Sequence, residues 1–195
     1  MTSDDNGIFP IFDVSGSAAA RGKQYGRQAG DLIRVSANIY KNVFEQKGIS
    51  WEKACDLARY FMPQIEQYNP DLLTEIKAVA EGAELPAEEI VAINARTEIM
   101  YGTRRQAKKE AETDIDGCTG AIAKADITAN GHTIHGQNWD WRDECADAAM
   151  VLRIRPDIGP DIMTFVEAGI LARCGMNSDG IAITGNHLQS DDDFD

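Results

Sequence analysis

The hydrophobic pattern of this 195-residue chain changes near residue 117, and this change constrains the fold more than any other feature. Before it, apolar side chains recur every three or four residues, which predicts helices. After it, short apolar runs alternate with turn residues, which predicts strands. Helices followed by strands favour an α+β fold over alternating βαβ units. We therefore expect one composite domain, with a helical region over residues 1–117 and an antiparallel sheet over residues 118–195.

Four helices are predicted in the first region, each from a capping signal and an apolar stripe. The first spans residues 18–46. The second opens after Ser50, and Pro63 either kinks it or ends it early. The third opens at Asn69-Pro70-Asp71, which combines a cap, a proline at the first position and an acid in the first turn. The fourth runs from Pro86 past Ile99.

Glycines recur at four-residue spacing in the first predicted helix, at Gly22, Gly26 and Gly30. Neighbouring Arg and Lys residues exclude a membrane helix. The spacing instead predicts a place where this helix packs closely against another element.

The second region is predicted to open with a hairpin. Its strands cover residues 119–125 and 132–139, and Asn130-Gly131 between them is the strongest local hairpin signal. Further strands are expected over residues 150–155, 162–167 and 180–184. Because hairpin strands are antiparallel, residues 137–140 should return close to the start of the first strand.

Charge and composition exclude several classes of function. A formal net charge of -13 argues against a nucleic-acid or anionic membrane surface, since phosphate binding needs clustered Lys and Arg. The chain lacks an apolar stretch of the roughly 18 to 20 residues that spans a bilayer, and its acidic N-terminus is unlike a secretory signal.

The cysteines, histidines and acidic tail give no metal signature. Cys55, Cys118, Cys145 and Cys174 are widely spaced and form no Cys-x-x-Cys pair, so we expect neither a disulfide scaffold nor a zinc site. His132 and His135 should point to opposite faces of a strand. The acidic residues 191–195 are interpreted as solvated. We expect no cofactor and no metal, and a reducing, cytoplasmic compartment.

Cys118 is the candidate nucleophile. A buried structural cysteine is the default for any single Cys, but Cys118 follows Gly117 at the junction between a polar segment and the first predicted strand. The hairpin should also bring it close to the polar residues 137–140. A conventional Cys-His pair with His187 is an alternative, which has no signature around it.

Motifs around these residues occur in order along nearly the whole chain. They are Arg21-Gly22-x-Gln24-Tyr25-Gly26, Asp116-Gly117-Cys118-Thr119, Asn130-Gly131, Gly136-Gln137-Asn138-Trp139-Asp140, Glu167-Ala168-Gly169-Ile170 and Gly175-Met176-Asn177-Ser178-x-Gly180-Ile181-Ala182. Together they resemble the acyl-coenzyme A:6-aminopenicillanic acid (isopenicillin N) acyltransferase family. The shorter core is also similar to the acid ceramidase and bile-salt hydrolase branches of the same superfamily.

This resemblance implies an N-terminal nucleophile hydrolase, a four-layer αββα sandwich made as an inactive precursor. It implies that Cys118 cleaves the bond after Gly117 and then uses its own α-amine, whose ordinary pKa is about 7.7 to 8.0, as its base. By the same resemblance, Asp140 holds the new amine and Asn186 stabilises the oxyanion. Asn138 and Trp139 are expected to contact the substrate, a small acyl amide or an acyl-CoA.

Such relatives continue beyond the point where this chain stops, so the resemblance also predicts a C-terminally truncated, incomplete sandwich. An exposed sheet edge could then pair with another copy of the chain. Transfer of the acyl group to water or to an amine remains open. So does a non-catalytic fragment that acts as a binding or interaction module.

Overall fold

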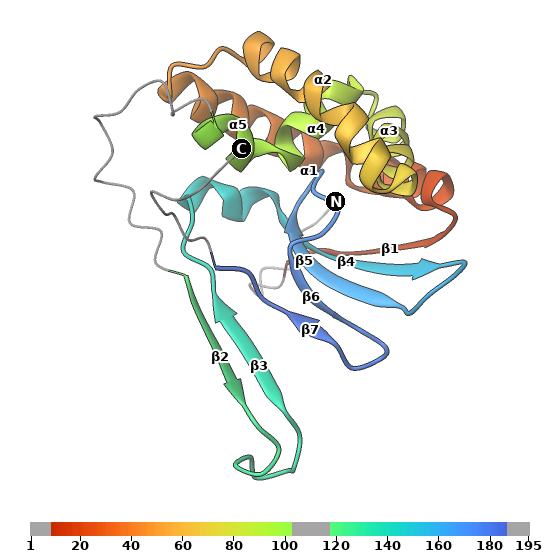
Figure 1. Cartoon of the computed structure of the whole chain (residues 1–195), viewed down its shortest axis with the longest axis vertical. Helices are drawn as coiled ribbons and strands as arrows, with labels where there is room; N and C mark the ends of the chain where they lie inside the picture. The colour runs from red at the N-terminus through yellow and green to blue at the C-terminus, as the bar shows by residue number, and fades with distance from the viewer. Residues whose placement is uncertain (1–8, 103–117, 187–195) are drawn as a thin grey trace.

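The computed structural model describes residues 9–102 and 118–186, which form an α+β fold. Helices cover one face of a five-stranded sheet, and a separate two-stranded hairpin extends away from it (Figure 1). The helices are α1 (Ala18–Gln46), α2 (Trp51–Tyr68), α3 (Pro70–Ala83), α4 (Ala87–Asn94) and α5 (Arg96–Gly102). The strands are β1 (Ile11–Gly16), β2 (Thr119–Ala123), β3 (Ile134–Asn138), β4 (Ala149–Pro156), β5 (Ile162–Glu167), β6 (Cys174–Asn177) and β7 (Ala182–Ile183).

The three predicted helix starts are confirmed by side-chain caps. Ser17, Ser50 and Asn69 each accept a hydrogen bond from a backbone N–H in the first turn of α1, α2 and α3. The early end at Pro63 is wrong, because α2 continues through it to Tyr68. The predicted fourth helix is divided at Ala95 into α4 and α5.

The five-stranded sheet has the order β1-β4-β5-β6-β7. The strands from β4 to β7 are antiparallel, as expected, but β1 pairs with β4 in parallel, with Ile11 opposite Val151. The prediction that all helices precede all strands is therefore wrong for the N-terminal part of the chain, because strand β1 precedes α1. Phe12 and Val14 of β1 are buried in the same core as the helices. Residues before and after the change in hydrophobic pattern near residue 117 thus share one core.

The predicted hairpin is confirmed. β2 and β3 pair antiparallel, with Thr119 opposite Asn138. The connection is longer than a two-residue turn and covers residues 124–133, with Gly131 at a φ of 69°. The register brings the residues after β3 back beside the residue before β2, which is Cys118.

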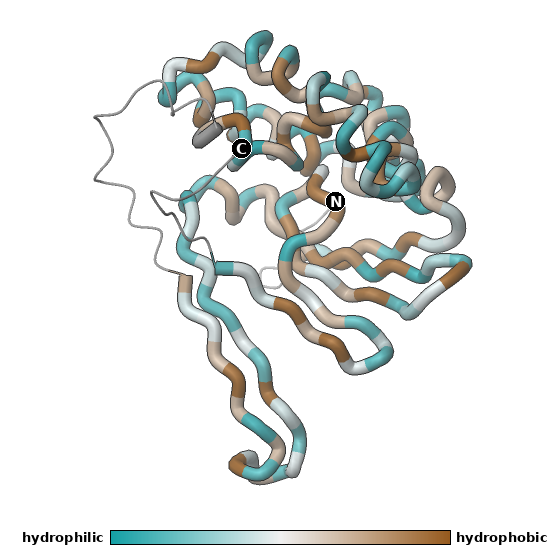
Figure 2. The backbone as a smooth tube through the Cα atoms, in the orientation of Figure 1, coloured by the Kyte–Doolittle hydropathy of each residue, from teal (hydrophilic) through white to brown (hydrophobic). Residues whose placement is uncertain are grey.

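The two faces of the large sheet differ. Met150, Leu152 and Val166 are buried in the core under the helices. Val151 lies opposite Phe165 in the β4–β5 register, and Met163 lies opposite Met176 in the β5–β6 register. Directly opposite residues share a face, so these side chains point away from the helices. Both faces of these strands therefore carry apolar side chains, and the strands contain successive hydrophobic residues (Figure 2). None of the helices in the described part of the chain is long and apolar enough to cross a membrane.

The glycine spacing in α1 marks its contact with α3. Gly22 and Gly26 lie against the backbone of α3, and a Cβ on Gly22 would meet Glu75 O at 2.5 Å. Beside them, Arg21 Nε and Nη2 donate to the buried Glu75 carboxylate at 2.8 and 2.6 Å. Burial raises the pKa of Glu75, and Arg21 opposes that rise. The third glycine, Gly30, has only ordinary contacts around it.

We predict that Gly26→Ala destabilises the protein, because the new Cβ would overlap the backbone oxygen of Val79 and lie 2.7 Å from Ala83 N. The expected loss is about 2 kcal/mol or more, since a rigid helix backbone must move. Gly30→Ala in the same helix is the control and should be neutral or stabilise by up to about 1 kcal/mol. Urea unfolding measures both, and equal losses would contradict this account of the helix contact.

Candidate active site

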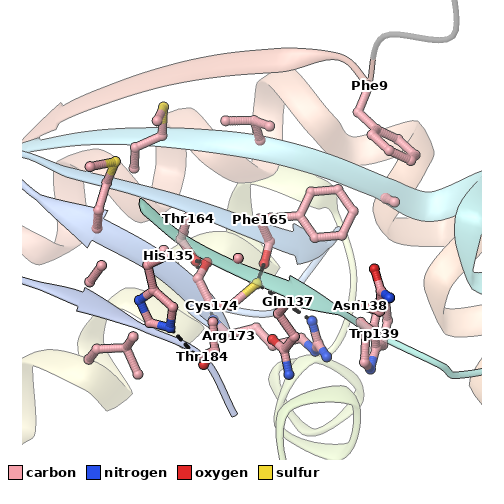
Figure 3. A pocket seen from close by; sticks show the side chains of 18 of the residues that line it. Phe9, His135, Gln137, Asn138, Trp139, Thr164, Phe165, Arg173, Cys174 and Thr184 are labelled. Atoms are coloured by element: carbon pink, nitrogen blue, oxygen red, sulfur yellow. Dashed lines mark hydrogen bonds between the residues drawn. The ribbon is translucent and has the colours of Figure 1, made fainter. Parts of the chain in front are cut away.

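A cavity of about 1390 Å³ lies against the sheet face that points away from the helices. Strand β3 contributes His135 and Gln137 to its wall, and strands β4 to β7 contribute the floor (Figure 3). Phe9, Trp139 and Phe165 make much of the wall aromatic. Phe165 packs edge-on against both other rings, at centroid distances of 5.0 Å to Phe9 and 6.4 Å to Trp139.

Cys118 and Asp140 are brought together by the hairpin register. The half-buried Cys118 precedes β2, and its Sγ lies 4.0 Å from the backbone oxygen of Asp140. The predicted return of the second hairpin strand to the first is therefore confirmed. Asn138, Trp139 and Asp140 line the cavity. Gly117, on the other side of the predicted cleavage point, lies outside the described residues.

Asn186 also lies beside Cys118. Its Nδ2 donates to the backbone oxygen of Cys118 at 3.2 Å, while its Oδ1 accepts from Gln137 Nε2 at 2.9 Å. Gln137 Nε2 also donates to Gly185 O at 2.6 Å. The glutamine thus fixes which end of the Asn186 side chain faces Cys118. Gln137 was expected only as part of the polar cluster, and the structure gives it this orienting role.

Arg173 is a residue of the cavity wall that the sequence analysis did not identify. Its guanidinium carbon lies 3.5 Å from the ring centroid of Trp139, so the two groups are in close cation–π contact. Trp141 is nearly parallel to Trp139, at a distance of 6.5 Å between the ring centroids. Burial lowers the pKa of Arg173, and the Cys174 thiol and the Glu167 carboxylate oppose that change.

The cavity wall is anchored to the helices through a fully buried carboxylate. Glu167 at the end of β5 accepts a hydrogen bond from Tyr40 of α1 and lies 3.4 Å from Arg96 of α5. Trp141 Nε1 donates to the same Tyr40 hydroxyl at 3.2 Å. A buried charge needs such partners, so this cluster fixes the segment that follows β3. A lone Glu in a strand gives no sequence signal for this role.

The loop after Glu167 is held by two polar side chains from the helices. The Tyr25 hydroxyl accepts from Gly169 N at 2.8 Å and donates to Ile170 O at 3.1 Å. Asn94 Nδ2 donates to Gly169 O at 2.8 Å, and its Oδ1 accepts from Leu171 N at 3.1 Å. Gly169 has a φ of 94°, which an L side chain rarely adopts. The Glu-Ala-Gly-Ile motif is thus a structural support for the segment that carries Arg173.

His135 is the histidine that lines the cavity in the described part of the chain. His135 hydrogen bonds to Thr184 Oγ1 at 3.0 Å across the cavity wall. His187, the partner in the Cys-His alternative, lies outside the described residues, as do the acidic residues 191–195. Over residues 9–102 and 118–186, no group of three or more His, Cys, Asp or Glu side chains could hold a metal ion.

These features define an α+β protein with a thiol beside an aromatic cavity that contains an arginine. No family model matches the chain. A curated relative, the 40 kDa form of acyl-coenzyme A:6-aminopenicillanic-acid-acyltransferase from Emericella nidulans, is 37% identical over 132 residues. The match covers 68% of this chain and 34% of the relative, so the chain spans about a third of its length. The chain is therefore a relative of the acyl-coenzyme A:6-aminopenicillanic acid acyltransferases, as its motifs indicate.

We predict that iodoacetamide at pH 8 labels Cys118 first and Cys55 and Cys145 last in the folded protein. Burial raises the pKa of the Cys55 thiol to about 11 and that of Cys145 to about 12. At pH 8 a thiol of pKa about 11 is only about 0.1% thiolate, the form that reacts. Peptide mapping after timed labelling measures the order. Cys174 is a half-buried comparison, and labelling in urea, where all four should react alike, is the control. Rapid labelling of Cys145 in the folded chain would contradict the prediction.

Proposed function

We propose that this chain is a self-cleaving cysteine N-terminal nucleophile hydrolase or acyltransferase that acts on amide bonds through a thioester acyl-enzyme. The contact between Cys118 Sγ and the backbone of Asp140, beside the aromatic cavity, carries the proposal. The relationship to an acyltransferase supports it. Cleavage would divide the chain into a segment of residues 1–117 and a segment that begins with Cys118.

In the proposed self-cleavage, Cys118 Sγ attacks the carbonyl carbon of Gly117. The C–N bond between the two residues breaks, and the thiol proton passes to the departing nitrogen, which becomes the α-amine of Cys118. Water then hydrolyses the thioester, which gives Gly117 a terminal carboxylate and restores the thiol. The absence of a side chain on Gly117 leaves the carbonyl accessible to the sulfur.

In each later turnover, the α-amine of Cys118 acts as the base for its own thiol. An α-amine has an ordinary pKa of about 7.7 to 8.0, so it can accept a proton near neutral pH, and no histidine is needed. We assign Asp140 to hold this amine, because the β2–β3 register brings its backbone to Cys118. We assign Asn186 as an oxyanion donor, because Gln137 orients its amide nitrogen towards the Cys118 backbone.

The proposed substrate is a small acyl amide or an acyl-CoA. The name of the relative gives acyl-coenzyme A and 6-aminopenicillanic acid as the compounds on which that protein acts. In this chain, Asn138 and Trp139 line a cavity large enough for a small molecule, and we assign them to substrate contact. Transfer of the acyl group to water would give an amidase, and transfer to an amine would give an acyltransferase.

The fold proposed for the active protein is the four-layer αββα sandwich. The helices and the five-stranded sheet would supply two of the layers. Exposed Met163 and Met176 on the face away from the helices support a second sheet packed over this face, because sheets of a sandwich bury apolar side chains between them. Both residues also line the cavity, so in this proposal the cavity would lie between the two sheets.

We predict that the purified chain separates into two fragments that meet at Gly117 and Cys118. Denaturing mass spectrometry would detect both masses, and sequencing would find Cys118 at the start of the second fragment. Cys118→Ala should remain intact, because it lacks the attacking sulfur, whereas the control Cys174→Ala should cleave normally. An intact wild-type chain under folding conditions would show that this chain does not process itself.

We further predict that Asn186→Ala slows fragment formation by about 10²-fold or more, the cost of removing one oxyanion donor. Gln137→Ala should slow it less, because Gln137 acts only by orienting Asn186. The rate of fragment appearance after refolding measures both effects. Cleavage of Asn186→Ala at the wild-type rate would exclude Asn186 as the oxyanion donor of this step.

A further inference from the structure

The cavity beside Cys118 contains an arginine that forms no ion pair with any of the described residues. The half-buried Arg173 lies on the cavity wall, and its guanidinium has no carboxylate oxygen within 4.0 Å among residues 9–102 and 118–186. The one hydrogen bond that its side chain makes in this part of the structure goes from Nη1 to Cys174 Sγ at 3.6 Å, a weak acceptor. Most of its donors are therefore available to a ligand.

The other arginines near this site are paired. Arg142 also lines the cavity, but its Nη1 donates to Gln46 Oε1 at 3.2 Å and lies 3.8 Å from Glu144. Arg96 lies against Glu167, which neutralises its charge. Glu167 is therefore in direct contact with Arg96, whereas it acts on Arg173 only through its electrostatic field, beyond ion-pair distance. The difference between Arg142 and Arg173 provides an internal control within one cavity.

Trp139 fixes the guanidinium in a defined orientation. A guanidinium centred 3.5 Å from the indole ring is held against its face, and the N–H groups along its edges stay available. An edge of this kind matches the two oxygens of a planar carboxylate through parallel hydrogen bonds. A partly buried cation of this kind gains more from an anion than an exposed one does.

A second polar atom of the same wall also lacks a partner. Gln137 Oε1 is buried and accepts no hydrogen bond from the described residues, although Nε2 of the same side chain makes two. Figure 3 shows Gln137, Arg173 and Cys174 together on the cavity wall. Because this oxygen has almost no accessible surface, Arg173 is the polar group of this wall that we assign to a ligand.

We propose that Arg173 is the specificity-determining residue of this cavity and that its guanidinium binds the carboxylate of an acylated amine. The carboxylate accepts from the guanidinium, and the apolar part of the ligand packs against Phe165. This inference rests on the proposed function only in taking the cavity as the substrate site.

The test measures binding, so that it does not depend on cleavage or turnover. Hippurate (N-benzoylglycine) carries an aromatic acyl group, an amide N–H and a carboxylate, and N-benzoylglycinamide is its neutral counterpart. Calorimetric titration of Cys118→Ala with hippurate should give a Kd of about 1 mM or tighter, within the range expected for a ligand of this size. The neutral amide should bind about 10-fold more weakly or worse, because it lacks the charge-assisted pair.

Variants in the Cys118→Ala background test the role of Arg173. Arg173→Gln should weaken hippurate binding about 10-fold or more and leave binding of the neutral amide within about twofold. Arg173→Lys should restore only part of the affinity, because an ammonium keeps the charge but lacks the planar fork. The control Arg142→Gln should leave hippurate binding unchanged, since Arg142 is already paired.

Several results would overturn the proposal. Equal affinity of hippurate and its amide, or no saturable hippurate binding, would exclude a carboxylate subsite. Equal loss of both ligands in Arg173→Gln would assign Arg173 a structural role. Tighter binding of inorganic phosphate than of hippurate would assign the arginine to a phosphate group. Failure of self-cleavage in the wild-type chain would leave these binding results valid, so the two proposals can fail separately.

Discussion

The buried carboxylate of Glu167 is the point at which the helices, the sheet and the cavity wall are joined. Tyr40 from α1 and Arg96 from α5 contact it inside the core, and Trp141 reaches the same Tyr40 hydroxyl from the segment that follows β3. A charge in this position is costly unless every partner is present, so removal of one partner would leave the others buried and unpaired. The cluster therefore links the position of the Trp139–Trp141 segment to the packing of α1 and α5. The loop after Glu167 is fixed by Tyr25 and Asn94 in the same way.

Local signals predicted much of this fold. The helix caps at Ser17, Ser50 and Asn69 and the β2–β3 hairpin involve residues close in sequence, and their patterns were sufficient. Long-range pairing was not predictable in this way. Strand β1 is a short apolar run whose partner, β4, lies about 140 residues away, so nothing nearby indicates the parallel pairing. Strand β6 has four residues and contains Gly175, which gives a weak strand pattern.

The same distinction between local patterns and long-range contacts applies to the candidate site. The hairpin pattern predicted that the segment with Asp140 would return to Cys118, because antiparallel register follows from sequence order. Arg173 and Glu167 were missed as parts of the site, since their roles arise from three-dimensional neighbours. Arg173 is identified by the Trp139 ring against it and by having no carboxylate oxygen within 4.0 Å in the described part of the chain. Glu167 is identified by its burial and by its contacts with Tyr40 and Arg96. The motifs identified in the sequence contain residues with two different roles, packing and chemistry. Arg21, Gly22, Tyr25 and Gly26 support the packing of α1, whereas Cys118, Asp140 and Asn186 are assigned to chemistry.

The central claim is that the Cys118 sulfur carries the acyl group beside this cavity. Trapping of the acyl-enzyme tests it most directly. The protein would be mixed with an activated ester of an aromatic acid, quenched in acid and analysed by mass spectrometry with peptide mapping. The account predicts one added acyl group on Cys118 that hydroxylamine removes, as expected for a thioester, and none on Cys118→Ala. Acylation of Cys174 or of lysines instead, or a hydroxylamine-resistant product, would contradict it.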